Sequence, residues 1–218
     1  MCCGGSSIVI WGSPDHGADT SAVQGKLKNV QQIQATGGAF AALLGDGSVV
    51  TWGSSHAGGD SSAVQDQLEN VQQVEGTDYA FAAILSDGSV VTWGDPDFGG
   101  DNSAVQEQLK TVCQVNGTVF AFAAIIEDGS LVTWGDPQDG SDSSSVQDQL
   151  RSVQQVQATW GAFAAILADR SVVCWGNPSC GGDSSAIQDQ LRAVQQIWFG
   201  GLAFAASLSD GSVVIYLG

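Results

Sequence analysis

The chain has 218 residues, of which 43% are apolar, so it can bury a sizeable core in one or two domains. Its 23 Asp and Glu residues outnumber 6 Lys and Arg residues, and the net charge of -17 repels nucleic-acid phosphates and anionic lipid headgroups. Nucleic acid is therefore excluded as an expected partner, and no apolar run reaches the roughly 18 residues of a transmembrane helix.

The N-terminus reads "MCCGG" and lacks the basic region and apolar run of a secretory signal. S-acylation of the adjacent Cys2 and Cys3 would allow peripheral membrane association. A flexible start, or the cut end of a longer repeat array, is favoured because one lipid signal binds weakly and no basic patch supports it. With five cysteines and no disulfide-framework spacing, an intracellular soluble location, or a peripheral one in an organelle, is favoured over secretion.

Most of the sequence is one unit of 41 residues repeated five times without insertion or deletion. Three residue types recur at this spacing of 41 positions: Trp11, Trp52, Trp93, Trp134 and Trp175; Phe40, Phe81, Phe122, Phe163 and Phe204; Asp19, Asp60, Asp101, Asp142 and Asp183. Tyr216 stands where a sixth Trp would follow. We therefore expect one repeat domain over 1–218. It comprises an extra N-terminal strand, 7–12, and repeats 13–53, 54–94, 95–135, 136–176 and 177–218.

Each repeat begins with a segment that predicts a short helix. In the second copy, "GGDSSAVQDQLENV" offers Asp60 or Ser61 as the N-cap and places Val64, Leu68 and Val71 on one helical stripe. A capping box, in which the second serine of this segment pairs with the glutamine three residues later, supports the same start. The expected helix has about two turns.

Three strands follow the helix in every repeat. In the second copy "VQQVEGT" is the first strand and "YAFAAIL" the second, while "SVVTWG", rich in β-branched residues, is the third. Asp87 and Gly88 between the last two strands are typical of a tight hairpin turn. Such a unit cannot bury both apolar faces alone, so neighbouring copies must stack, with the repeated Phe and Trp as core layers.

The stretch "VQQIQATGGAFAALLGDGSVVTWG" over 30–53 resembles the repeats of the regulator of chromosome condensation family. The matching residues, repeated in equivalent form in later copies, are Ala41, Ala42, Leu43, Asp46, Gly47, Val50, Trp52 and Gly53. The resemblance implies a β-propeller with one blade per repeat. The family's repeats are longer, its propellers commonly have seven blades, and its usual His before the second strand has no counterpart here.

The expected fold class is therefore all-β, a five-repeat β-propeller-like array with a short helix in each repeat. Six copies of the third strand accompany five copies of the first two, which leaves an open β-solenoid or arc as the alternative. Five copies would either close a small ring or leave it open.

Two regions differ between the copies, and topology places both at one end of each repeat. One is the turn between the first two strands, and the other is the loop after Trp-Gly. Aromatic side chains gather in these regions, as they do at protein interfaces. The predicted partner-binding residues are Tyr79, Phe98, Phe120, Trp160, Trp198 and Phe199. The alternative is that each aromatic packs only on its own blade.

Catalytic chemistry is poorly represented. The two histidines, His16 and His56, stand at different repeat positions, and no zinc-type cysteine spacing or phosphate-binding glycine motif occurs. Asp95, Asp97 and Asp101 are weak candidates for a calcium site, since turns and helix caps explain the same residues. No enzymatic activity and no cofactor are expected.

The sequence therefore predicts a non-catalytic interaction scaffold or accessory subunit that binds one or more protein partners, as in a multi-subunit complex, through its variable loops. Regulation of an enzyme, as a small-GTPase exchange factor or an inhibitor-like propeller, is the alternative that the family resemblance permits.

Overall fold

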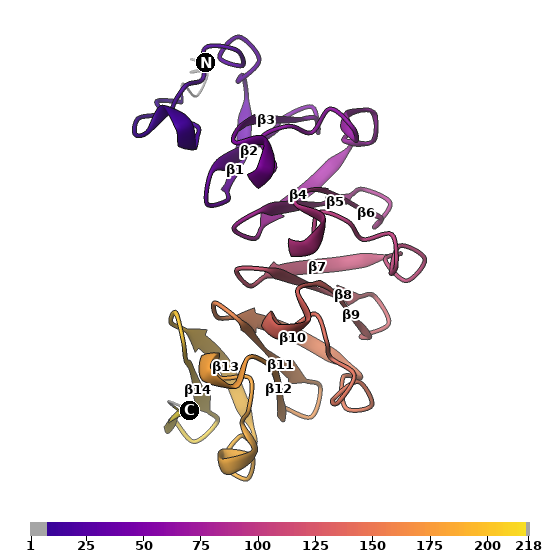
Figure 1. Cartoon of the computed structure of the whole chain (residues 1–218). Helices are drawn as coiled ribbons and strands as arrows, with labels where there is room; N and C mark the ends of the chain where they lie inside the picture. Colours follow the sequence, from indigo (N-terminus) through magenta and orange to yellow (C-terminus); the bar gives the residue numbers. More distant parts are fainter. Residues whose placement is uncertain (1–7, 217–218) are drawn as a thin grey trace, which may run out of the picture. The chain divides into compact units, whose positions relative to one another are not determined.

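The computed structural model describes residues 8–216 and consists of consecutive three-stranded sheets (Figure 1). It forms two compact units, Met1–Ala104 and Val105–Gly218, which we treat separately. Within every sheet the strand order follows the sequence and neighbouring strands are antiparallel. The expected all-β class and five-fold repetition are confirmed; we call the five sheets blades 1 to 5.

The first unit contains blades 1 and 2, with strands β1 (Val30–Ala35), β2 (Ala39–Leu44), β3 (Val49–Gly53), β4 (Val71–Gly76), β5 (Ala80–Leu85) and β6 (Val90–Gly94). The second unit contains blades 3 to 5, with strands β7 (Val112–Gly117), β8 (Ala121–Ile126), β9 (Leu131–Gly135), β10 (Val153–Ala158), β11 (Ala162–Leu167), β12 (Val172–Gly176), β13 (Val194–Phe199), β14 (Phe204–Leu208) and β15 (Val213–Tyr216). The three strands predicted for each repeat are confirmed.

The helices are shorter than expected and lie elsewhere. Every repeat has a three-residue 3-10 helix in the loop after Trp-Gly or its N-terminal equivalent: η1 (Pro14–His16), η2 (Ser55–Ala57), η4 (Pro96–Phe98), η5 (Pro137–Asp139) and η6 (Pro178–Cys180). The segment predicted as a two-turn helix is a run of turns, with single 3-10 turns at η3 (Gln65–Gln67) and η7 (Ser185–Ile187). The two-turn helix expected in this segment is therefore wrong, whereas the short helix expected in each repeat is present in the loop after Trp-Gly.

Side chains of this segment bond outside it, which explains why no helix forms. The Ser61 hydroxyl lies 2.8 Å from Gln65 Oε1 and 2.9 Å from the Thr51 hydroxyl on β3. Gln65 Nε2 donates to the backbone oxygen of Val49 in blade 1. Leu68 is buried as predicted, but in the core between blades 1 and 2. The apolar spacing reflects packing on a neighbouring blade.

The repeated Phe and Trp form the predicted core layer. The Phe81 and Trp93 rings stack with centroids 5.3 Å apart, and Trp93 Nε1 donates to the Gly58 oxygen at 3.0 Å. The equivalent pairs in other blades are Phe40–Trp52, Phe122–Trp134 and Phe163–Trp175. Burial of these rings is a major source of stability in blades 1 to 4.

Consecutive blades within a unit are joined by backbone bonds as well as by apolar contacts. At the hairpin between the last two strands, Gly47 of blade 1 accepts a hydrogen bond from the Val71 amide of blade 2, and Gly129 accepts from Val153 in the second unit. The Gln32 amide side chain both donates to Val74 O and accepts from Val74 N. Within each unit, the cited blades are thus joined by polar contacts around an apolar layer.

A strand is predicted over 7–12, but residues 8–12, which are its described part, do not form a strand. Ile10 packs against the apolar cluster of blade 1, whereas Val9 and Trp11 are exposed. Cys2 and Cys3 lie outside the described residues.

Candidate functional site

The two variable regions meet at one end of each blade, which we call the upper end. In four blades a threonine in the turn between the first two strands donates to a backbone oxygen in the loop after the third strand; these bonds are Thr36–Ala57, Thr77–Phe98, Thr118–Asp139 and Thr159–Cys180. The same hydroxyls accept from the backbone amide that starts the second strand. The predicted juxtaposition is confirmed, and threonine is the residue that fixes it.

The upper turns of neighbouring blades are linked to one another within each unit. In the first unit the Gly37 amide donates to the Asp78 oxygen at 2.9 Å. In the second unit Val119 N donates to Trp160 O, and Trp160 N donates to Gly201 O. This repeated bond spaces the turn residues regularly and brings the side chains of blades 4 and 5 together.

Four large apolar side chains are exposed at this end of blades 4 and 5, two of them in turns and two at the end of β13. The exposed fractions are 61% for Trp160, 47% for Trp198, 59% for Phe199 and 53% for Leu202. The Trp160 indole lies against the blade 5 turn, since a Cβ added to Gly201 would be 3.0 Å from Trp160 Cε2. We call Trp160, Trp198, Phe199 and Leu202 the upper aromatic surface.

The other predicted aromatics are less accessible. Tyr79 is exposed, but its ring lies 5.1 Å from the ring of the half-buried Phe98. Phe120 is also half-buried. Local packing on the blade therefore accounts for part of these side chains' surface. Leu202 was missed as a candidate because only aromatic residues were selected, although it lies in the variable turn.

Charge is distributed unequally between the two ends of the blades. All six Lys and Arg residues lie near the lower end: Lys26, Lys28, Lys110, Arg151 and Arg192 precede the first strand of a blade, and Arg170 is in a lower hairpin. In the described chain, the upper turns and the loops after the third strand contain no Lys or Arg; their acidic residues include Asp78, Asp95, Asp97, Asp136 and Asp139. The upper end combines carboxylates with aromatic rings.

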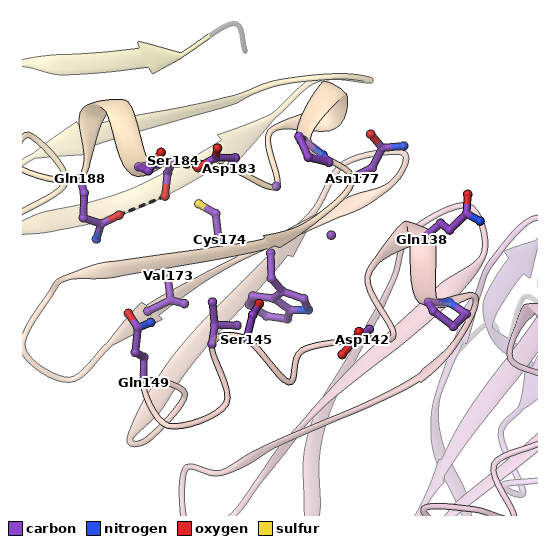
Figure 2. Close-up of a pocket in the computed structure, with 17 residues that line it drawn as sticks. Gln138, Asp142, Ser145, Gln149, Val173, Cys174, Asn177, Asp183, Ser184 and Gln188 are labelled. Atoms are coloured by element: carbon purple, nitrogen blue, oxygen red, sulfur yellow. Dashed lines mark hydrogen bonds between the residues drawn. The ribbon is translucent and has the colours of Figure 1, made fainter.

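A groove of about 870 Å³ opens between two successive loops of the second unit. Figure 2 shows Gln138 and Asp142 from the loop after β9, and Asn177, Asp183 and Gln188 from the loop after β12. Cys174 on β12 also lines it, at the place of a threonine in earlier repeats. Burial raises the pKa of the Cys174 thiol to about 11, which disfavours a reactive thiolate.

Two of the three aspartates proposed as weak cation ligands accept hydrogen bonds from backbone amides. The Asp95 carboxylate accepts from Asp97 N at 3.0 Å, and Asp101 accepts from Ser103 N at 2.8 Å. These are Asx-type turns, in which the carboxylate satisfies a local amide. Within residues 8–216 no three His, Cys, Asp or Glu side chains are grouped to hold a metal ion, and His16 and His56 are both exposed.

Taken with the strand topology, these features define the class of the chain: an all-β repeat protein built from propeller-type blades. No protein-family model matches the chain, and no curated protein matches it in sequence. Within the described residues no helix is both long and apolar enough to cross a membrane.

Solved structures with the same fold include propellers of the regulator of chromosome condensation type. Prp20p of Saccharomyces cerevisiae, the yeast RCC1, is 17% identical with a TM-score of 0.58, over 89% of this chain and 57% of that one. Human WBSCR16 is 18% identical with a TM-score of 0.55, over 86% of this chain and 61% of that one.

The CRINKLY WD40 ectodomain of the Arabidopsis thaliana receptor kinase ACR4 is 15% identical with a TM-score of 0.55, over 86% and 63% of the two chains. The chain thus spans less than two thirds of each of these proteins. The implied propeller fold is supported by these likenesses.

Proposed function

We propose that this protein is a non-catalytic interaction module, a scaffold or accessory subunit, that binds a protein partner through the upper aromatic surface. The observation that supports this most is the exposure of Trp160 and Leu202 in the upper turns of blades 4 and 5 and of Trp198 and Phe199 at the upper end of β13. Exposed large apolar side chains favour association, and Trp is enriched among residues that dominate binding energy.

Rigidity of the surface also supports binding. The backbone of Trp160 bonds to Val119 N and Gly201 O, so the indole is attached to a turn that is fixed on both sides. A partner would then bind without ordering a flexible loop, which lowers the entropic cost of association.

The charge pattern indicates what the partner surface would be. Carboxylates occur near the aromatics and basic side chains are confined to the lower ends, so the surface complements a protein segment that carries both Lys or Arg and apolar side chains. Prp20p, which shares the fold, has been studied for its binding to Gsp1p and histones. A partner whose enzymatic activity changes on binding would make this protein a regulator, the alternative function.

Affinity capture followed by quantitative binding tests the proposal. The full chain is immobilised as wild type, as the variant Trp160→Ser/Trp198→Ser/Phe199→Ser, and as Arg170→Ser/Arg192→Ser at the lower end. Proteins retained from an extract of the native cells are identified, purified and titrated. We expect the upper variant to bind at least about tenfold more weakly and the lower variant to bind like wild type.

Equal affinity of the upper variant and the wild type for every purified partner would contradict the proposal. Circular dichroism of the three proteins establishes that each is folded, so that lost binding is not lost structure. Because the three replaced side chains are exposed, their removal leaves the core unchanged.

A further inference from the structure

The groove between the loops after β9 and β12 follows β12, which is the edge strand of the blade 4 sheet (Figure 2). Its floor is β12 itself, through Val173 and Trp175. One wall is the segment before β10, and the other is the segment after β12. We call this site the β12 groove, and its walls carry Asp142, Ser145 and Gln149 on one side and Asp183, Ser184 and Gln188 on the other.

The β12 groove is long enough for several residues of an extended chain. Gln138 and Asn177, in the loops after β9 and β12, line its upper end, and Gln149 and Gln188 line its other end (Figure 2). β12 has five residues, and a strand advances about 3.3 Å per residue. The groove therefore matches an extended segment of about four or five residues.

Hydrogen bonds to the blades hold both walls in place. Gln188 Nε2 donates to the Val172 oxygen of β12 at 2.8 Å, and Gln188 Oε1 accepts from the Ser184 hydroxyl at 3.0 Å. In the opposite wall Gln147 Nε2 donates to the Leu131 oxygen of β9 at 3.3 Å. A groove with fixed walls needs little ordering when a partner binds, which lowers the entropic cost of association.

The same groove occurs one repeat earlier, along β9, with a volume of about 380 Å³. Its lining residues stand 41 positions before those of the β12 groove: Gln108 before Gln149, Thr133 before Cys174, and Gln147 before Gln188. The repeat therefore specifies this kind of groove, and the β12 groove, at about 870 Å³, is the larger of the two.

The charged side chains of the β12 groove are all acidic. Among the described residues that line it, Asp142 and Asp183 carry charge and none is Lys, Arg or His. Hydrogen bonds from Ser144 and Ser185 hold the pKa of these two exposed carboxyls below its ordinary value, so both are ionised at neutral pH. Val146 adds apolar surface beside them, on which the aliphatic stem of a Lys or Arg side chain can lie.

The upper end of the β12 groove adjoins the turn that carries Trp160. The Asn177 amide in the groove donates to the Gly161 oxygen at 2.8 Å, and Gly161 directly follows Trp160 in the chain. Trp160 belongs to the upper aromatic surface and is 61% exposed. A partner held on that surface can therefore continue into the groove.

We propose that an extended segment of the protein partner lies in the β12 groove and pairs its Lys or Arg side chains with Asp142 and Asp183. This inference rests on the proposed function, because the segment belongs to the partner held by the upper aromatic surface. Hydrogen bonds between cationic side chains and carboxylates are stronger than those between neutral groups, and complementary charge also fixes the register of the segment.

The test separates binding in the groove from general attraction to the net charge of -17. A fluorescein-labelled Gly-Lys repeat peptide is titrated against the full chain by fluorescence anisotropy at physiological salt concentration. The groove variant is Asp142→Asn/Asp183→Asn. The control, Asp128→Asn/Asp169→Asn, neutralises two exposed aspartates that bond to serine amides in the same way in the lower hairpins of blades 3 and 4.

Both variants change the net charge equally, and Asn keeps the side-chain oxygen that accepts the serine amide. We expect the groove variant to bind the Gly-Lys peptide at least about fivefold more weakly than wild type, and the control to stay within about twofold. Equal weakening in the two variants, or no binding of the peptide to wild type, would overturn the proposal.

Amide NMR signals of the full chain locate the bound peptide. Signals of Cys174, Ser184 and Gln188 are expected to shift on addition of the Gly-Lys peptide, whereas those of Ser130 and Ser171 in the lower hairpins are expected to stay unchanged. Shifts of equal size at both places would also overturn the proposal, since they would indicate binding all over the acidic surface.

Failure of this inference is distinguishable from failure of the proposed function. The variant Trp160→Ser/Trp198→Ser/Phe199→Ser keeps the β12 groove and is expected to bind the Gly-Lys peptide like wild type. The purified partner is then titrated against both variants, and each is expected to weaken its binding. A partner weakened by the upper variant but not by the groove variant overturns the groove alone, whereas one unaffected by the upper variant overturns the proposed function.

Discussion

At the residue scale, the buried Trp52, Trp93 and Trp175 each combine ring stacking with one hydrogen bond to a glycine carbonyl. In blade 2 the Trp93 indole stacks on Phe81 and donates to Gly58 O, and the whole side chain is buried. Trp11 is the first member of the same 41-residue series, yet it is 85% exposed. Repetition in sequence therefore does not imply an equal contribution to stability.

The change Trp93→Phe keeps an aromatic ring but removes the Nε1 donor and part of the buried volume. We expect the free energy of unfolding to fall by about 2 kcal/mol, because a buried carbonyl loses its donor and a small cavity forms. Urea denaturation of Trp93→Phe and of the matched control Trp11→Phe measures this. The control is expected to match wild type, and equal losses in the two variants would refute the role of burial.

A half-buried carboxyl between blades 1 and 2 links stability to pH. Burial raises the pKa of Glu75 from its ordinary 4.5 to about 7, and hydrogen bonds from Gln34 and Gln73 oppose the shift. The folded state therefore holds this proton more tightly than the unfolded chain does. Its contribution to stability is complete below about pH 4.5 and is lost as the pH rises toward 7.

Glu75→Gln removes the titrating proton while keeping a side chain of the same size. We expect the variant to gain about 1 to 3 kcal/mol over wild type at pH 8 and to differ little from it at pH 4.5. Chemical denaturation at both pH values measures the difference, with the exposed Glu69→Gln as control. A gain of equal size at both pH values would show that titration of Glu75 is not the cause.

At the element scale, the loop after each Trp-Gly must pass close to a core ring. Gly58 has φ +88°, and a Cβ at this position would lie 2.7 Å from Phe81 Cδ2. Gly211 in the last lower hairpin has nearly the same φ, +86°, but its Cβ would have no atom within 4 Å. Substitutions at these two glycines therefore distinguish the cost of backbone strain from the cost of a steric clash.

Gly211→Ala is expected to cost about 1 kcal/mol, because only the left-handed backbone conformation opposes the new methyl group. Gly58→Ala adds a clash with Phe81 and is expected to cost at least about 1 kcal/mol more. Thermal unfolding of the two variants measures the difference. Equal shifts in melting temperature would mean that the loop moves away from the ring without loss.

The strands could be predicted from the sequence because their signals are local. Val-rich alternation, Asp-Gly turns and the fixed 41-residue step define β4, β5 and β6 within a residue or two. The conformation of the segment before each first strand could not be predicted from the sequence. The spacing of Val64, Leu68 and Val71 is typical of a helix, but these residues pack on blade 1. The capping side chains likewise bond to β3. Tertiary contacts therefore override the local helical pattern.

At the scale of the whole molecule, repetition explains the stacked core within each unit. Val49 of blade 1 and Val74 of blade 2 are buried in one shared apolar cluster. The variable upper turns were identifiable by comparing the copies, and so were the aromatic candidates. The solvent exposure of these aromatic side chains could not be predicted from the sequence. Packing such as that of Tyr79 on Phe98 depends on side-chain positions that the sequence pattern does not define.

The measurement that tests the binding account most directly is photo-crosslinking from the two ends of one blade. A photoreactive phenylalanine analogue is placed at Trp160 on the upper end of blade 4, or at the exposed Arg170 on its lower end, in the full chain within native cells. We predict that one protein is crosslinked from position 160 and not from position 170. Crosslinking of equal yield from both positions, or none from position 160, would contradict protein binding by the upper aromatic surface.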